Sequence, residues 1–511
     1  MNTLVTVGGL AYNFVIIILC TIFVLARRKK RGDEMEDFLS GGRRTGWMAV
    51  AASMALGVLG GGHINGVPVQ TWADGCGTIF YCLGTGCFFI FAMRLTGIWY
   101  RRTGVNTVND LFARMFHPAF SPILAGLVVG YAWLVLCVET QSMGVVIMNM
   151  TGLSMAASCI IGAILGVLYV LLAGQEEVMI VNLVNAILMY IFGIICLIFV
   201  GTRIAGGWKA IDDTILSRNP EFLAALGNGQ ILKTYTIGTF LAAALGMNFL
   251  QGNIQPCKDS KTVRQLRQSC MAAIPMNVFF GVIVILLAFA GKGLVDSGMM
   301  SLDMMDGIES PSAGANSVVQ LVVQFMPSWL QICVIGMFLA AMLSTWSMLA
   351  LSIALTMNRD ILSLLPKKQS RKTENWTSRL WIFIAGVFAG LVGTSVQGQA
   401  NLALSWGWGW FIPLFILFCI GMWWKRSRNG SLIAVLLCWV VNCILTFTPL
   451  AANLGLEGNN YSIFMFVFSL VFGIIFTAVD KNARPGFRRV YEAQRVEYNA
   501  AHGLDTNIKE A

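Results

Sequence analysis

Runs of apolar residues separated by short polar segments extend along almost the whole chain. Each run has roughly 18 to 25 residues, which is long enough to cross a hydrocarbon core of about 30 Å as an α-helix. A helix satisfies its own backbone hydrogen bonds, so it is the form that such a run takes in lipid. The pattern predicts thirteen membrane spans, at about residues 6–26, 46–72, 76–98, 121–148, 153–173, 178–204, 233–255, 269–292, 329–356, 378–397, 400–424, 430–449 and 460–479.

Residues that break helices interrupt two of these spans. The second span carries five glycines and one proline in the twelve residues from Gly57 to Pro68. Inside a helix, glycine costs about 1 kcal/mol relative to alanine and proline about 3 kcal/mol, so we expect the helix to unwind there. A second break is expected in the seventh span, from Gly246 to Pro256. Unwound backbone at membrane depth is tolerated only where it is buried in protein or lines a cavity, and a bound cation and solute can satisfy its polar groups.

The two breaks lie five spans apart and open two successive sets of five spans. An odd number of spans per set makes the second set run upside down relative to the first. Either break alone is also compatible with close helix packing through small residues, but breaks at matched positions indicate an inverted-repeat transporter with a site near the membrane midplane. We therefore expect an all-α integral membrane protein with a 5+5 inverted-repeat core and a broken first helix in each repeat. The expected units are a peripheral first helix with a cytoplasmic loop (1–45), the first repeat (46–205), an extracytoplasmic loop (206–232), the second repeat (233–424), two peripheral helices (425–479) and a cytoplasmic tail (480–511).

The composition argues against a soluble enzyme or a nucleic-acid-binding protein. Of the 511 residues, 57% are hydrophobic and 12% are charged, and the spans leave no segment for a catalytic domain. The formal net charge is +10, but the basic residues follow the first, third, seventh, ninth and eleventh spans, which is typical of a cytoplasmic face. The acidic turn from Gln175 to Glu177 is the one exception on that face. We expect a protein of the inner or plasma membrane with its N-terminus outside and its C-terminus in the cytoplasm.

Four short motifs are spread along the chain. They are the segment from Asp37 to Arg44 followed by Gly46-Trp47, the turn Gly206-Gly207-Trp208, Gln255 followed by Lys258, Ser260 and Lys261, and the segment from Gly421 to Arg426 followed by Asn429-Gly430. Their order and spacing resemble the sodium:solute symporter family over nearly the whole chain. The resemblance implies the leucine-transporter-like form of the inverted-repeat fold, with sodium as the coupling ion, a small-molecule solute as the partner and no other cofactor.

Hydroxyl side chains in the ninth span offer oxygen ligands. Ala341, Ser344 and Thr345 lie at i, i+3 and i+4, so one helix face presents a carbonyl and two hydroxyls together. A sodium ion requires hard oxygen ligands of this kind. The family resemblance pairs this face with the backbone carbonyls of Leu56 and Leu59 in the broken second span. The alternative is that both hydroxyls bond back to their own helix, as such residues often do.

One departure from the family pattern concerns the start of the sixth span. The family's Thr-Asp-x-x-Gln is here Val181-Asn182-Leu183-Val184-Asn185. The acidic residue, which in the family is linked to the passage of sodium to the cytoplasm, is missing. Sodium coupling therefore depends on the five ligands named above.

Polar groups at the first break are candidates for binding the solute. Gly60, Gly61 and Gly62 offer bare backbone, while His63 and Asn65 would be costly if they faced lipid. The alternative for His63 is a packed histidine that is bonded to a neighbouring carbonyl.

Further candidates come from other spans. Glu139 is the clearest carboxylate inside a span and is a functional candidate by default. It can bind a cationic group, carry a coupling proton, act as a neutral acid beside Gln141, or simply pair with a structural partner. Trp406 shares a helix face with Trp410 in the eleventh span, where anchoring at the membrane interface is the usual role of tryptophan. The polar candidates from the second repeat are Asn248, Gln251 and Asn253.

The first break also indicates a class of solute. The segment from Gly60 to Gly66 is similar to the choline-transporting branch of the family, but a tryptophan of that branch falls at Val58. One wall of an aromatic cage for a quaternary ammonium is therefore absent. An organic cation or a zwitterion is expected with Glu139 present, and a carboxylate held by backbone amides stays open as an alternative.

The sequence thus predicts a secondary transporter that moves a small organic solute into the cell together with sodium by alternating access. One alternative keeps the fold but couples transport to protons through Glu139 or His63. Another is a transporter-like membrane sensor that reports solute binding to a partner. Such a sensor needs a signalling domain, and the tail from Asp480 to Ala511 is too short to be one. The sequence indicates no oligomeric state.

Overall fold

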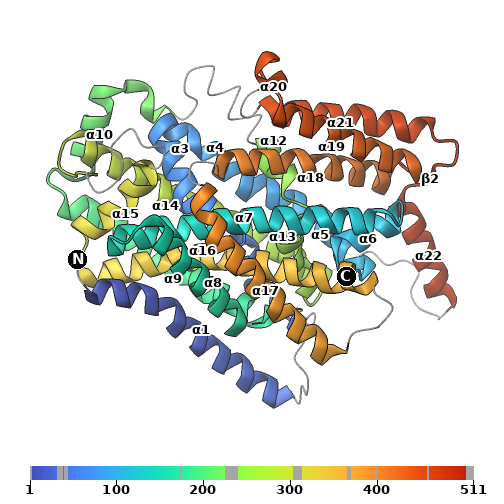
Figure 1. Ribbon diagram of the computed structural model, residues 1–511, viewed down its shortest axis with the longest axis horizontal. Helices are drawn as coiled ribbons and strands as arrows, with labels where there is room; N and C mark the ends of the chain where they lie inside the picture. Colours follow the sequence, from blue (N-terminus) through green and yellow to red (C-terminus); the bar gives the residue numbers. More distant parts are fainter. Residues whose placement is uncertain are drawn as a thin grey trace.

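Long helices form the whole body of the protein (Figure 1). The computed structural model describes residues 3–31, 38–39, 44–172, 174–224, 240–302, 313–364, 370–396, 400–456 and 460–501. In Figure 1, α1 (Thr3–Arg31) lies along one edge of the bundle, and α19 (Asn429–Phe447) and α21 (Asn460–Val479) lie along the opposite edge. The strands found in the described residues are β1 (Lys425–Arg426) and β2 (Arg484–Pro485), which form one antiparallel pair. The prediction of an all-α protein is confirmed.

Each predicted membrane span has a helical counterpart. Ten helical segments of the described chain are long and apolar enough to cross a membrane, and the two interrupted helices and α18 account for the other spans. After α1, the helices that form spans are α2 (Trp47–Leu56) with α3 (Val67–Asp74), α4 (Ile79–Leu83) with α5 (Ile90–Thr103), α7 (Phe120–Thr151), α8 (Met155–Leu172), α9 (Gln175–Arg203), α12 (Phe240–Gly246) with α13 (Gln251–Asp259), α14 (Val263–Asp296), α16 (Ser328–Thr356), α17 (Arg371–Gly393), α18 (Ala400–Trp423), α19 and α21.

The first break is shorter than the sequence indicates. The α2 helix ends at Leu56, the chain is non-helical from Gly57 to Gly60, and the π-helix η1 (Gly62–Gly66) leads into α3. The predicted break extends to Pro68, but that proline lies in the first turn of α3. A proline there costs little, because the first amides of a helix have no intrahelical partner to lose.

The second break is also shorter than predicted. The chain is non-helical from Met247 to Leu250, and α13 then continues through Pro256 to Asp259. All nine residues of α13 are buried, and a Cβ on Gly252 would lie only 3.0 Å from the backbone oxygen of Met348 in α16. This dense packing outweighs the low helix propensity of proline, since tertiary contacts routinely override intrinsic preference.

Several short elements were not expected from the pattern, because none is an apolar run of membrane length. The helix α15 (Ala313–Phe325) packs against α3 and α14, and α6 (Val108–Met115) packs against α7. The remaining elements are η2 (Gly75–Thr78), η3 (Gly84–Phe89), α10 (Gly207–Arg218), η4 (Pro220–Leu223), η6 (Met357–Ile361), η7 (Leu362–Leu364), η8 (Thr394–Val396), α20 (Leu450–Asn453) and α22 (Phe487–Ala501).

The α16 helix forms the centre of the core. Every residue from Val334 to Thr356 is buried, and α16 packs against α1, α7, α9 and α17. A helix that is apolar on all sides belongs in such a position. The two hydroxyl residues predicted to bind sodium therefore lie in the middle of the protein and away from lipid.

The acidic exception in the charge pattern has a local explanation. Arg28, near the end of α1, forms ion pairs with Glu176 at 3.2 Å and with Glu177 at 3.0 Å in the first turn of α9. The side chain of Arg28 is only 14% exposed. These acidic residues therefore compensate a neighbouring arginine and join the first helix to the core.

Candidate functional site

The first break meets α16 at the residues predicted to hold sodium. The hydroxyl of Thr345 donates to the backbone oxygen of Leu56 at 3.2 Å, and both residues are buried. The hydroxyl of Ser344 is buried without a hydrogen-bond partner. The alternative that both hydroxyls bond back to their own helix is therefore not what the structure shows. A buried hydroxyl without a partner, beside a hydroxyl that reaches a carbonyl on another helix, is an arrangement that can coordinate a cation through oxygen.

Leu59 and Ala341 complete the predicted ligand set. Both residues are fully buried, and the amide of Leu59 donates to the backbone oxygen of Leu56 at 3.0 Å. Leu59 thus lies within the same turn as Leu56, and Ala341 lies one helical turn before Thr345 on the α16 face that meets this turn.

Glu139 reaches the first break from α7. Its Oε2 atom accepts a hydrogen bond from the amide of Gly61 at 2.7 Å, and the residue is only 4% exposed. A Cβ built on Gly60 would lie 2.5 Å from both carboxylate oxygens and 2.6 Å from the Thr345 hydroxyl. A Cβ on Gly61 would overlap Ser142, which is also on α7. Bare glycine backbone is therefore what lets α7 and α16 approach the break this closely.

His63 is packed among polar neighbours from other spans. Its Nε2 atom lies 3.3 Å from the hydroxyl of Thr85, and its ring centroid lies 5.3 Å from that of Tyr81. Thr85 lies 3.3 Å from the side-chain oxygen of Asn277, whose amide donates to the backbone oxygen of Ala55 at 3.1 Å. The His63 Nδ1 atom is buried without a hydrogen-bond partner. The histidine is thus packed among polar groups at the first break.

Other first-repeat candidates lie close by. The side-chain amide of Asn65 donates to the backbone oxygen of Ser142 at 3.1 Å, while its Oδ1 atom is buried without a partner. A Cβ on Gly62 would lie 3.0 Å from the Tyr81 hydroxyl. Gln141 is buried on α7, two residues after Glu139. Asn65 and Gly62 thus contact neighbours of the first break, whereas Gln141, two residues after Glu139, lies on a different side of α7.

The candidates at the second break have a different surrounding. Asn248 accepts a hydrogen bond from Thr96 at 3.0 Å, and Asn253 donates to the backbone oxygen of Met247 at 3.2 Å. Gln251 donates to the Tyr100 hydroxyl at 3.0 Å and accepts from the amide of Val108 at 2.7 Å. The hydrogen bonds of Asn248 and Gln251 thus hold the second break against α5 and α6. The side chain of Trp406 lies outside the described residues.

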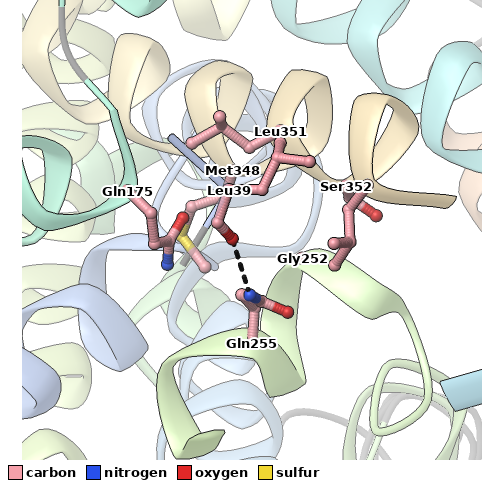
Figure 2. A pocket seen from close by; sticks show the side chains of 8 residues that line it. Leu39, Gln175, Gly252, Gln255, Met348, Leu351 and Ser352 are labelled. Atoms are coloured by element: carbon pink, nitrogen blue, oxygen red, sulfur yellow. Dashed lines mark hydrogen bonds between the residues drawn. The ribbon is translucent and has the colours of Figure 1, made fainter. Parts of the chain in front are cut away.

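A small cavity lies beside α13 and α16, and Figure 2 shows the residues around it. The side-chain amide of Gln255 donates to the backbone oxygen of Leu39 at 3.2 Å across it. Ser352 also lines the cavity, and its hydroxyl is buried without a partner. Ser352 is two turns beyond Ser344 along α16. None of the residues predicted to bind the solute lines this cavity.

Two neighbours of the first break were not among the site residues predicted from the sequence. Ser142 lies three residues after Glu139, so helical spacing could have placed both on one face. Tyr81 gave no signal, because a single tyrosine in an apolar span is common and its proximity to Gly62 depends on how two separate helices pack.

The fold and the site together define a class of protein. Helices of membrane length, two of them interrupted, enclose a buried polar site at one interruption, which is the architecture of a secondary transporter. Each interrupted helix begins a set of five spans in chain order. The chain is therefore a multi-pass membrane transporter.

The family follows from comparison with known proteins. The model of the sodium:solute symporter family matches residues 38–438, and the chain belongs to this family. The osmoregulated proline transporter OpuE of Bacillus subtilis (strain 168) is 23% identical over 484 residues, which cover 90% of this chain and 93% of that protein. The predicted family and the prediction of sodium-coupled symport of a small solute are confirmed.

Two solved structures share the fold. A sodium-coupled sialic acid symporter in a substrate-bound, outward-open state aligns with a TM-score of 0.74 at 16% identity, over 94% of this chain and 99% of that chain. MhsT in complex with L-phenylalanine aligns with a TM-score of 0.52 at 15% identity, over 85% of this chain and 97% of that chain. The predicted inverted-repeat, leucine-transporter-like fold class is confirmed.

Proposed function

We propose that this protein carries a small zwitterionic solute into the cell together with sodium, with the ion bound where the first break meets α16. The observation that carries the proposal is the contact of the Thr345 hydroxyl with the Leu56 carbonyl at 3.2 Å, beside the unpartnered hydroxyl of Ser344. The backbone oxygens of Leu56, Leu59 and Ala341 and the two hydroxyls would coordinate the ion.

Such an ion would bridge two elements that can move relative to each other. Leu56 ends the first half of a broken helix, whereas Thr345 lies on the buried α16 helix. A ligand shifts a conformational equilibrium only by its difference in affinity between the two states. Sodium would therefore favour the state in which the broken helix and α16 are together, and this state would present an ordered solute site.

The solute would bind beside the ion, along the first break. Two buried atoms there have no hydrogen-bond partner, Nδ1 of His63 and Oδ1 of Asn65, and a polar solute can satisfy both. The backbone of Gly60, Gly61 and Gly62 adds further polar groups. Glu139 lies at the same break, whereas the sequence candidates Asn248, Gln251 and Asn253 are hydrogen-bonded at the second break and are left out of this proposed site.

A zwitterion fits this site better than the other solute classes. Its cationic group would find acceptors such as Asn65 Oδ1, and its carboxylate would find backbone amides of the break. The resemblance to a proline transporter over 90% of the chain supports an amino-acid-like solute.

The proposed direction of transport follows from charge. Basic residues gather at the loops assigned to the cytoplasm, so the N-terminus would lie outside and the C-terminus inside, in an inner or plasma membrane. One sodium ion with a neutral zwitterion carries one positive charge inward. A membrane potential of about 100 mV then contributes about 2.3 kcal/mol to accumulation.

Coupling to protons instead of sodium is the alternative. It is supported by the burial of two titratable groups, Glu139 and His63, at the first break. It differs from the main proposal in what drives uptake. A proton-coupled protein would accumulate solute in sodium-free medium when the outside is made acidic.

Uptake into proteoliposomes tests the proposal. Radiolabelled proline, as the zwitterion, would be offered with an inward sodium gradient or a matched potassium gradient, and unlabelled proline, choline and pyruvate would compete. We expect sodium-dependent uptake that a negative interior potential stimulates and that proline reduces most. Uptake that is equal in potassium and rises with outside acidity would instead establish proton coupling. Preferential competition by choline or pyruvate would overturn the zwitterion assignment.

A further inference from the structure

Glu139 differs from every other buried acidic residue in the described part of the chain. The buried acidic residues there are four, Glu139 and three others. Glu177 pairs with Arg28 at 3.0 Å, Asp259 accepts a hydrogen bond from the side chain of Gln175 at 3.2 Å, and Asp360 accepts bonds from Thr107 and Asn109 at 2.8 Å each. Glu139 has one hydrogen bond, from the Gly61 amide, and no ion-pair partner.

A single backbone amide is too little to compensate a buried carboxylate. Taking an ionised carboxylate out of water costs far more than one hydrogen bond returns, so buried charges are normally paired or bound to a metal ion. Within the described residues no lysine or arginine side chain pairs with Glu139, and the Gly61 amide is the one hydrogen-bond donor to it. A cation that binds next to it would supply the missing partner.

The geometry places the carboxylate where that cation would bind. The point at which a Cβ on Gly60 would lie is 2.5 Å from both oxygens of Glu139 and 2.6 Å from the Thr345 hydroxyl. Gly60 follows Leu59 directly in the chain. The carboxylate, the hydroxyl and the first break therefore surround one small volume.

We propose that Glu139 belongs to the sodium site, where its carboxylate supplies negative charge to the bound ion, and does not bind a cationic group of the solute. This inference rests on the sodium site proposed above. It has a consequence for the solute: because sodium would neutralise this carboxylate, the site beside it favours a solute without net positive charge.

The test separates the charge of Glu139 from its hydrogen bond. Glu139→Gln keeps an oxygen that can accept a hydrogen bond from the Gly61 amide and removes only the charge. Glu139→Asp keeps the charge on a side chain that is one methylene shorter. Asp360→Asn is the matched control, since it removes another buried carboxylate that lies 15 residues beyond Thr345, about 22 Å along a helix. Thr345→Ala reports on the sodium site itself.

The measurement is the sodium concentration that gives half of the maximal rise in unfolding temperature of the detergent-purified protein. Potassium chloride would replace sodium chloride to keep ionic strength constant. We expect Glu139→Gln to raise this concentration at least about tenfold, Glu139→Asp to raise it less, and Asp360→Asn to leave it unchanged. A charge at contact distance from the ion makes an effect of this size reasonable.

The outcomes distinguish the two proposals. If Thr345→Ala weakens sodium binding and Glu139→Gln does not, the role of Glu139 is wrong while the sodium site stands. If Thr345→Ala has no effect either, the site itself is wrong. Should the glutamine variant fail to purify as a folded protein, the aspartate variant decides, and a sodium affinity equal to that of the unmodified protein would overturn the inference.

Discussion

The two interrupted helices occupy matched positions in the two repeats, yet their surroundings differ. At the first break, Asn65 Oδ1, His63 Nδ1 and the facing hydroxyl of Ser344 are buried without partners. At the second break, Asn248 and Gln251 hydrogen-bond to the first repeat through Thr96 and Tyr100. The repeat architecture therefore supplies two interruptions, and in the described residues the polar side chains of the first keep unpaired atoms, whereas Asn248 and Gln251 of the second are bonded. Unsatisfied buried groups indicate where a ligand binds, and satisfied ones indicate a structural joint.

Backbone geometry explains how this difference arises. The first break contains consecutive glycines, so α7 and α16 can bring Glu139 and Thr345 against its main chain. The second break runs from Met247 to Leu250 and contains no glycine. Its side chains take part in the apolar packing, and Phe249 packs on Phe418 with ring centroids 5.1 Å apart.

A methyl group at Gly60 should produce the largest effect. Gly60→Ala places a Cβ against the Glu139 carboxylate and the Thr345 hydroxyl, so one of them must move. Overpacking costs about 1–3 kcal/mol, and we expect both sodium-dependent stabilisation and sodium-driven uptake to fall at least about tenfold. Gly130→Ala on α7 is the control, because no atom lies within 4 Å of its added Cβ. Equal behaviour of the two variants would contradict the proposed crowding at the first break.

Removal of the Thr345 hydroxyl should have the next largest effect. Thr345→Ala deletes a proposed ligand and the 3.2 Å contact to Leu56. A lost bond to a charged group costs about 1.5–3 kcal/mol, so the sodium concentration for half-maximal uptake should rise about tenfold or more. Thr345→Ser keeps the hydroxyl and should retain most of the affinity. A serine variant as weak as the alanine variant would show that the methyl group, and not the oxygen, is what matters.

At the second break we expect lower stability with unchanged sodium affinity. Gln251→Ala removes the bonds to Tyr100 and to the amide of Val108, which leaves buried polar groups unsatisfied at a cost of about 1–3 kcal/mol. The unfolding temperature should drop, while the sodium concentration for half-maximal stabilisation stays the same. If this variant loses sodium affinity as Thr345→Ala does, the distinction between the two breaks fails.

The smallest effect on the sodium site is expected at the peripheral helix. Arg28→Ala removes an ion pair to Glu176, which is 14% exposed, and one to Glu177, which is buried. We expect a loss of stability of about 1–3 kcal/mol, because a buried carboxylate loses a partner, and no change in sodium affinity. Thermal unfolding at low and high potassium chloride measures it, and the loss should shrink as salt screens the pairs in the parent protein. A large loss that does not depend on salt would point to packing of the arginine stem instead.

The sequence predicts the fold of this protein more completely than it predicts the contacts at the site. The spans could be predicted because lipid demands long apolar helices, and the breaks could be found because glycine and proline are conspicuous inside such runs. The ends of the breaks could not, since Pro256 stays helical only because α13 is completely buried. Nor could the helix α15, which is too short to span a membrane.

At the site, the sequence predicted which residues are candidates, but it could not predict which of them lie together. The local motif of Ala341, Ser344 and Thr345 follows from helix periodicity, but its contact with Leu56 joins residues 289 positions apart. The hydrogen bond between Gly61 and Glu139 joins residues 78 positions apart on different helices. Such contacts depend on how helices pack, so the sequence offered Glu139 as a candidate without indicating that it lies beside the proposed ion ligands.

Equilibrium binding of radioactive sodium to the purified protein tests the central claim most directly. The parent protein, Thr345→Ala and Gln251→Ala would be compared at constant ionic strength with potassium as the competing ion. The account predicts saturable sodium binding that potassium does not displace, that Thr345→Ala abolishes or weakens at least about tenfold, and that Gln251→Ala leaves intact. Sodium binding of equal affinity in the Thr345→Ala variant, or its loss in Gln251→Ala alone, would contradict the claim that the ion binds at the first break.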